Sequence, residues 1–214
     1  MNNVTQKAGG AMPAQKIAQA EFIWASDSLD NLPDTELPEI AVLGRSNVGK
    51  STLVNRLPRR RKLARPSAPP GHTRKLNFYR IELTGVANRD SGRVEFLLVD
   101  LPGFGYAKFS KRQREALSRL TVDYLATREN LCAVCLLNDC RREPQAEELS
   151  IRDLCFDSGA HLFVIATKID KLKQRERHKQ LQRVAGDYGL EKEDLLFSGE
   201  KTTPALWERL LPLL

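Results

Sequence analysis

The sequence has no apolar run long enough to cross a membrane. A membrane-spanning helix needs about 18 or more mostly apolar residues in a row, and no segment approaches that length. Residues 1–20 also lack the continuous apolar core of about 7 to 15 residues that a secretory signal peptide carries. We therefore expect a cytoplasmic protein without a membrane span.

Cysteine is scarce, with four residues in a chain of 214: Cys132, Cys135, Cys140 and Cys155. Cys132 and Cys135 lie in the apolar run 131–137, which has the composition of a buried strand. Side chains three apart on a strand point to opposite faces, so these two sulfurs should not share a metal ion. We interpret the cysteines as reduced thiols in the core.

Acidic residues are outnumbered, with 27 Asp and Glu against 34 Lys and Arg, for a net charge of +7. This balance suits an anionic partner, although it is moderate enough to serve solubility alone. A chain of this length with 41% hydrophobic residues can form one full α/β domain. We expect a flexible tail over residues 1–20 and a single domain over 21–214.

The strongest chemical signal is the sequence GRSNVGKS at residues 44–51. An apolar segment precedes it and helix-forming residues follow, which is the strand–loop–helix context of a phosphate-binding P-loop. Two glycines let the loop turn so that backbone N–H groups point inward, and the helix adds its positive dipole end. The alternative, an ordinary turn before a helix, needs motif and flanks to coincide by chance. The expected nucleotide-binding residues are Gly44, Arg45, Ser46, Asn47, Val48, Gly49, Lys50 and Ser51.

Strand-like and helix-like segments alternate from residue 40 to the end of the chain. Two strand-like runs, 76–83 and 93–99, are joined by a turn-rich segment and should pair antiparallel. The alternation predicts an α/β fold with a doubly wound, mostly parallel sheet, one antiparallel strand pair and helices on both faces. Sites in such sheets lie at the carboxyl ends of the strands.

Three segments sit at strand ends and can meet the ligand of the P-loop. Asp100 is placed to hold the water shell of a Mg²⁺ ion, and the Gly103 amide can approach a γ-phosphate. Thr73 offers a hydroxyl that completes the Mg²⁺ shell only when the third phosphate is present. Asp170 can accept both N–H groups of guanine, and it would reject adenine, which lacks those donors.

The series GRSNVGKS, GHTR, DLPGFGYA, TKID and FSGEK resembles the five nucleotide-binding motifs of translation-factor-class P-loop GTPases. It most closely resembles the EngB (YihA/YsxC) family of bacterial ribosome-assembly GTPases, through DLPGFGYA and through Thr167 where most GTPases carry Asn. The resemblance implies a GTPase domain that binds GTP or GDP with Mg²⁺. It also implies a role in assembly of the large (50S) ribosomal subunit and, by association, in cell division and septum formation.

The resemblance also implies individual site residues. Lys50, Thr73 and Gly103 are the expected catalytic residues, and Ser51 and Thr73 are the expected Mg²⁺ ligands. Lys168 and Asp170 are expected to select guanine. The nucleotide-binding positions beyond the P-loop are Gly71, His72, Thr73, Arg74, Lys75, Asp100, Leu101, Pro102, Gly103, Thr167, Lys168, Ile169, Asp170, Phe197, Ser198 and Gly199.

Phe104 stands where many GTPases place a glutamine that orients the attacking water. A phenyl ring makes no such hydrogen bond, so we expect slow intrinsic hydrolysis. Acceleration would come from a partner, or from a K⁺ ion held by Asn47, as in the potassium-dependent GTPases that share this P-loop asparagine. The alternative for Asn47 is a turn residue that tolerates an unusual φ.

Basic residues gather between 56 and 65 without one acidic residue among them. This segment either contacts ribosomal RNA or is a solvated loop, and the helix near residues 108–119 is a second basic candidate. His72 is either a catalytic base or a plain surface histidine. We expect a monomer that binds the large subunit and its rRNA. The rival interpretations are an ATP-dependent phosphotransferase and a non-catalytic, nucleotide-stabilised division protein.

Overall fold

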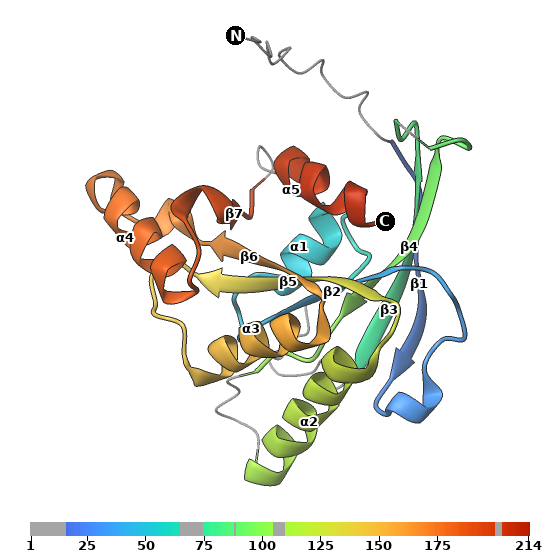
Figure 1. Ribbon diagram of the computed structural model, residues 1–214, viewed down its shortest axis with the longest axis horizontal. Coiled ribbons are helices and arrows are strands. Elements are labelled where there is room, and N and C mark those ends of the chain that lie inside the picture. The colour runs from blue at the N-terminus through green and yellow to red at the C-terminus, as the bar shows by residue number, and fades with distance from the viewer. Residues whose placement is uncertain (1–15, 65–74, 88, 105–109, 200–202) are drawn as a thin grey trace, which may run out of the picture.

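A seven-stranded sheet forms the centre of the protein (Figure 1). The computed structural model describes residues 16–64, 75–87, 89–104, 110–199 and 203–214. Within them the sheet order is β1-β3-β4-β2-β5-β6-β7. The strands are β1 (Lys16–Ser26), β2 (Glu39–Gly44), β3 (Leu76–Thr84), β4 (Arg93–Asp100), β5 (Leu131–Asp139), β6 (His161–Thr167) and β7 (Leu196–Phe197).

The sheet is mostly parallel, as predicted. β3 runs antiparallel to β4, which confirms the expected pair, and it also runs antiparallel to the edge strand β1. The pairings of β2 with β4 and β5, of β5 with β6 and of β6 with β7 are all parallel. Every residue of β2 is buried, which is typical of a central strand covered on both faces.

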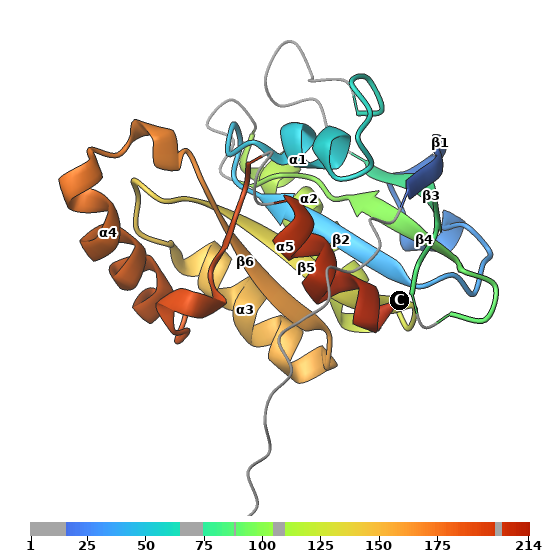
Figure 2. The same ribbon diagram turned by 90° about the horizontal axis from the view of Figure 1, so that it is seen from above.

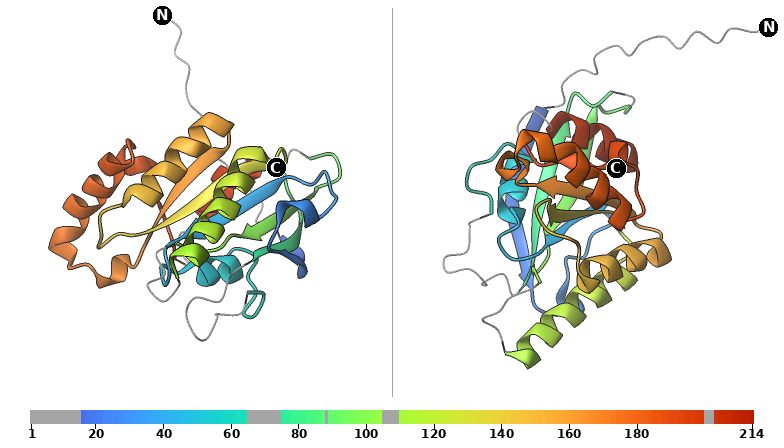
Figure 3. Two further views of the ribbon diagram at one scale, coloured as in Figure 1. Left: turned by 90° about the horizontal axis from the view of Figure 1, so that it is seen from below. Right: turned by 90° about the vertical axis from the view of Figure 1, so that its left-hand side faces the viewer.

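Helices cover both faces of the sheet (Figures 2 and 3). One face packs against α1 and α5, through side chains that include Leu53 and Trp207. The other face packs against α2, α3 and α4, through side chains that include Tyr124, Ile151 and Val184. The helices are α1 (Lys50–Arg56), α2 (Lys111–Thr127), α3 (Ala146–Ser158), α4 (Gln174–Asp187) and α5 (Thr203–Leu210). This confirms the predicted doubly wound α/β class.

None of the described helices is both long enough and apolar enough to cross a membrane. The longest, α2, has 17 residues. Its start is set by the N-cap Ser110, whose hydroxyl accepts a hydrogen bond from the Gln113 amide at 3.3 Å. The Gln113 side chain accepts one from the Ser110 amide in return, at 3.1 Å.

The first strand begins earlier than predicted. β1 starts at Lys16, so residues 16–20 are part of the sheet and the expectation that they belong to a tail was wrong. Ile17 pairs with Leu83 and Ala20 with Ile81 on β3, and both partly buried side chains pack against the core. An edge strand buries little, so its apolar alternation is weak. The remainder of the predicted tail, residues 1–15, lies outside the described part of the chain.

The expected opposite orientation of Cys132 and Cys135 was also wrong. Both pack against the same core cluster, because the pairing of β5 with β2 has a register shift between Leu131 and Ala133. The Cys132 thiol donates to the Glu39 carbonyl at 3.2 Å. Burial raises the pKa of both thiols, that of Cys135 to about 12, so both stay protonated at neutral pH.

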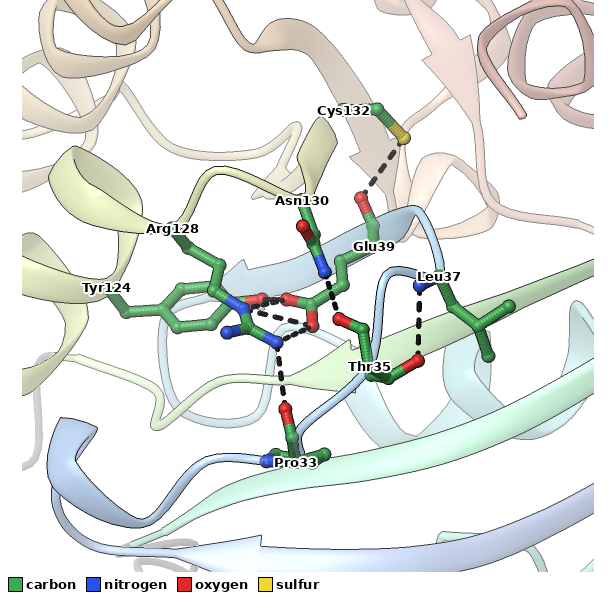
Figure 4. Close-up of polar contacts among 8 residues, drawn as sticks. All are labelled: Pro33, Thr35, Leu37, Glu39, Tyr124, Arg128, Asn130 and Cys132. Carbon is green, nitrogen blue, oxygen red and sulfur yellow. Dashed lines mark hydrogen bonds and ion pairs between the residues drawn. The ribbon is translucent and has the colours of Figure 1, made fainter.

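A buried carboxylate joins β2 to the end of α2 (Figure 4). Glu39, fully buried at the start of β2, accepts hydrogen bonds from the Tyr124 hydroxyl and from the Arg128 guanidinium, whose Nη2 lies 2.6 Å from Oε1. Arg128 also donates to the Pro33 carbonyl at 3.3 Å. Burial, and then the Glu39 charge, raise the Tyr124 pKa, so its hydroxyl remains a donor. The network fixes the C-terminal end of α2 to the sheet.

We predict that Arg128→Met will lower the free energy of unfolding by about 3–5 kcal/mol, because it leaves the buried Glu39 charge without its cation. Urea denaturation measures this. Arg119→Met, on the exposed side of α2, is the matched control and should change stability by about 0.5 kcal/mol or less. Adding Glu39→Gln to Arg128→Met should recover part of the loss, since the amide keeps an acceptor for Tyr124 without the charge. An Arg128→Met protein as stable as the wild type would contradict this account.

Candidate functional site

Within the described residues, parts of four of the five predicted motifs lie at one edge of the sheet. Parallel strands end at the same edge, and β2, β4, β6 and β7 each run into one of the motifs. The segments are residues 44–51 after β2, 100–104 after β4, 167–170 after β6 and 197–199 at the end of β7.

The P-loop connects β2 to α1 through a strained turn. Asn47 has φ 62° and Gly49 has φ 112°, both in the left-handed region. The Val48 amide donates to the Arg45 carbonyl at 3.2 Å, and α1 begins at Lys50, with Gly49 as an N-cap that has no capping side chain. The predicted strand, glycine loop and helix are therefore present as successive elements. The left-handed φ of Asn47 fits the alternative interpretation of this residue, as a turn residue instead of a K⁺ ligand.

Lys50 and Asp100 form a buried ion pair at this edge. Their exposed fractions are 8% and 3%, so each charge depends on the other for its partner. The following residue, Leu101, donates its amide to the Val42 carbonyl at 3.0 Å, which ties the loop after β4 to β2. A phosphate that reaches Lys50 therefore competes with Asp100 for the ammonium group.

The loop after β4 is also attached to the P-loop. The Ser46 amide donates to the Phe104 carbonyl at 3.0 Å, and Arg45 and Phe104 form a parallel bridge. The Phe104 side chain packs against the core cluster on the α2 and α3 face. Gly103 thus lies between a residue bonded to the P-loop and the end of β4. Phe104 therefore has a packing role, and its phenyl ring has no group that could orient a water molecule.

Arg45 reaches α3, a link that the motif analysis missed. Its guanidinium contacts the Gln145 side chain and lies 3.9 Å from the Glu148 carboxylate, which is 2% exposed. Gln145 and Glu148 form the capping box of α3, with the Gln145 amide donating to Glu148 at 2.8 Å. Burial raises the pKa of Glu148. The signal available in the sequence was the spacing of three between Gln145 and Glu148.

Residues 167–170 are held by the end of β5. Lys168 has φ 59°, and its ammonium lies 3.0 Å from Asp139, which also binds Arg141 at 2.7 Å. Burial alone would raise the pKa of Asp139, but the hydrogen bonds from Arg141 and Lys168 outweigh it and hold that pKa well below its usual range. Asp139 was not among the predicted site residues, although it lies two residues after the apolar run 131–137. The buried Thr167 hydroxyl donates to the Asn138 carbonyl at 3.1 Å.

Asp170 carries an exposed carboxylate beside this fixed lysine. Its side chain is 71% exposed, and its ion pair with Lys171, at 3.4 Å, is exposed as well. An exposed pair of this kind adds little stability, so the carboxylate is free to accept donors from a ligand. Ile169, the residue before it, packs partly against the core and fixes the turn.

The last motif, residues 197–199, is attached to β6 at the same edge of the sheet. The Ser198 amide donates to the Ala166 carbonyl at 3.0 Å, and its hydroxyl accepts from Arg56 on α1 at 3.3 Å. The Gly199 carbonyl accepts from the Thr203 hydroxyl at 2.9 Å. Phe197 pairs with Ala166 in the sheet. Residues 197–199 therefore lie next to the end of β6, and the sequence alone did not show this.

Four predicted site residues, Gly71, His72, Thr73 and Arg74, lie outside the described residues, so their roles stay predictions. Lys75 is described, and its contact is an exposed ion pair with Asp27 at 3.8 Å. Across the residues that the structure describes, no group of three or more His, Cys, Asp or Glu side chains is placed to hold a metal ion. Among the described residues, the Ser51 hydroxyl and the Asp100 carboxylate are oxygen donors close to the P-loop, and oxygen donors suit Mg²⁺.

The basic segment projects from the end of α1. Arg59, Arg60, Arg61 and Lys62 are exposed. The segment is fixed at its far end by Ala64, whose amide donates to the Asn55 side chain at 2.9 Å, while the Asn55 amide group donates to the Ala64 carbonyl at 2.6 Å. The four cations of residues 59–62, which we call the basic arm, thus share one short exposed loop.

Comparisons with known proteins identify relatives over most of the chain. A family model described as "50S ribosome-binding GTPase" matches residues 39–168. A probable GTP-binding protein EngB of Lactobacillus gasseri is 40% identical over 85% of this chain and 88% of its own. A probable GTP-binding protein EngB of Pelotomaculum thermopropionicum is 40% identical over 91% of this chain and 93% of its own. The crystal structure of a probable GTP-binding protein engB shares the fold, with a TM-score of 0.61, 22% identity, and coverage of 82% of this chain and 97% of that one.

We predict that Gly44→Ala will destabilise the P-loop edge. A Cβ at this position would lie 2.8 Å from the Leu137 carbonyl oxygen and 2.9 Å from a Val48 methyl group, and φ is 153°. We expect a loss of about 1–3 kcal/mol in unfolding free energy. Gly186→Ala is the control, since a Cβ there meets nothing within 4 Å inside α4. That change should add about 0.5–1 kcal/mol. Thermal unfolding of both variants checks the pair, and unchanged stability of Gly44→Ala would refute the crowding argument.

Proposed function

This chain belongs to the EngB family of GTP-binding proteins and is a GTPase, and on that basis we propose that it acts as a nucleotide switch in assembly of the large (50S) ribosomal subunit. The observation that carries the proposal is the junction at Lys50, where the P-loop, Asp100 and the loop 101–104 are bonded to one another. The description of the matching family, a 50S ribosome-binding GTPase, supports the partner. An associated role in cell division and septum formation is proposed from the resemblance alone. Action in the cytoplasm as a monomeric single domain is proposed as well, with the domain assignment based on the length and composition of the sequence.

We propose that residues 44–51 hold the phosphates and that Lys50 leaves Asp100 to neutralise the β- and γ-phosphates. Mg²⁺, when bound, would neutralise further phosphate charge; Ser51 and Thr73 would hold it directly and Asp100 through its water shell. The Gly103 amide would approach the γ-phosphate. Water then attacks the γ-phosphorus in line, and the bond to the β-phosphate oxygen breaks to release GDP and phosphate.

Hydrolysis is proposed to be slow until a partner acts. The Phe104 ring packs against the core and provides no hydrogen bond for the attacking water. A K⁺ ion held by Asn47 is the second proposed source of acceleration. Its contribution is measured by comparing hydrolysis rates in K⁺ and Na⁺ buffers, and equal rates would remove the ion from the mechanism.

Guanine selection is proposed to rest on residues 167–170 and 197–199. The Asp170 carboxylate is exposed and can accept the N1–H and N2–H donors of guanine. Lys168 is fixed beside it by Asp139, and residues 197–199 are held against the end of β6, where they can contact the base. Adenine presents no matching donor pair, so it would leave the carboxylate unpaired.

We predict that Asp170→Asn will weaken GDP binding about a hundredfold or more, because two hydrogen bonds to a charged acceptor are each worth about 1.5–3 kcal/mol. The asparagine amide can donate to the C2 carbonyl of xanthine, so the same variant should gain affinity for xanthosine diphosphate. Titration with fluorescent nucleotides measures both. Asp90→Asn is the control, since its side chain is exposed in the turn between β3 and β4, at the opposite end of these strands from Asp100. Unchanged GDP affinity in Asp170→Asn would refute the assignment.

The basic arm is the proposed contact with ribosomal RNA. Its four cations are exposed on one loop, and phosphate contacts supply most of the non-specific affinity for nucleic acid. The arm follows α1 and precedes the segment that contains Thr73, so a change at Thr73 upon GTP binding can alter how the arm is presented.

We predict that Arg60→Glu/Arg61→Glu will weaken binding to purified large subunits and will reduce the slope of log affinity against log salt by about 1 to 2, since each lost phosphate contact removes about 0.7 to 0.9. GTP affinity should not change. Lys173→Glu/Arg175→Glu at the start of α4 makes the same change in net charge and is the control. Subunit binding that responds equally to both double variants would mean that only net charge matters, and the arm would lose its assigned role.

A further inference from the structure

An apolar groove of about 800 Å³ lies between α2 and α3, beside the loop that follows β4. The two helices run along the same face of the sheet (Figure 3). The groove is lined by the side chains of Phe104, Leu117, Val122, Ile151 and Leu154. Val122 is 42% exposed in this groove. This volume is within the usual range of protein pockets that bind a ligand, about 300–1,000 Å³.

The rim of the groove is acidic, in contrast to the chain as a whole. Glu115, Glu147, Asp153 and Asp157 line it, and no Lys or Arg among the described residues does. Glu115 lies 3.9 Å from Lys111, and Asp153 pairs with Arg152 at 2.7 Å, but such exposed pairs are weak. In a chain whose net charge is +7, the groove is a local site that repels phosphate and attracts cations.

The groove is connected to the P-loop at two places, through Phe104 and through the start of α3. Phe104 lines the groove and is bonded to Ser46 through its carbonyl. Arg45 reaches the start of α3 through Gln145 and Glu148. A ligand that moves the P-loop or the loop 101–104 will therefore change the shape of the groove, and an occupant of the groove will act back on the nucleotide site.

We propose that this groove binds a basic amphipathic segment of a protein in the large ribosomal subunit. Its apolar side chains occupy the floor, and its Lys and Arg side chains pair with the rim. Charge decides between the two macromolecules of the subunit, because RNA would bring phosphates to four carboxylates while an RNA-binding protein carries cations. This inference rests on the proposed function, and it places protein in the groove and RNA at the basic arm.

The test is site-specific photo-crosslinking to purified large subunits. A benzophenone amino acid replaces Val122 in the groove or Trp24 on β1, which is 41% exposed and serves as the control position. Each protein is pelleted with subunits in a GTP analogue, irradiated, and analysed after RNase or protease treatment. We expect an adduct at Val122 that survives RNase and is lost with protease, at about five times the yield at Trp24 or more.

Charge reversal supplies the second readout. Glu147→Lys/Asp157→Lys should lower the Val122 adduct about fivefold or more, whereas Glu129→Lys/Glu193→Lys makes the same change in net charge away from the groove and should not. Nucleotide affinity should be unchanged in both. Adducts with RNA alone, with a second copy of this chain alone, or insensitive to the rim charges would overturn the inference. If the protein pellets with the subunits but forms no protein adduct, only the assignment of the groove is refuted. If the protein does not pellet with the subunits, both the proposed function and the assignment of the groove are refuted.

Discussion

The candidate site depends on the buried ion pair between Lys50 and Asp100. Two charges are withdrawn from water at the edge of the sheet, and the cost of burying either alone means that each needs a partner. A phosphate offers Lys50 a new partner and leaves Asp100 to find another, such as the water shell of a cation. The exchange therefore involves the loop after β4, whose Leu101 and Phe104 are bonded to β2 and to the P-loop.

The helix that follows this loop is fixed at its other end. Tyr124 and Arg128, near the C-terminal end of α2, are held by the buried Glu39 at the start of β2. At the start of α2, Ser110 and Gln113 form a local capping box, and the side chains of Lys111, Arg112 and Glu115 are exposed. The middle of α2, through Leu117 and Val122, lines the acidic groove.

Local patterns predicted the parts of the fold that local physics determines. The P-loop was predictable because its glycines, lysine and serine lie together in the sequence. The core strands were predictable because each is a continuous run of apolar residues. The start of β1 was not, since an edge strand hides its pattern, and the orientation of Cys132 depended on a register shift with another strand. The contacts of Arg45 with α3 and of Lys168 with Asp139 join residues far apart in the chain. Such pairs follow from the strand order, which the sequence alone did not determine.

The central claim is that the nucleotide on the P-loop controls association with the large ribosomal subunit. The most direct measurement is the affinity of the wild-type protein for purified large subunits, determined by co-sedimentation at fixed salt with either a non-hydrolysable GTP analogue or GDP. The account predicts binding that is about tenfold tighter or more with the analogue, corresponding to a coupling free energy of about 1.4 kcal/mol or more. Equal affinities in the two nucleotide states would contradict it.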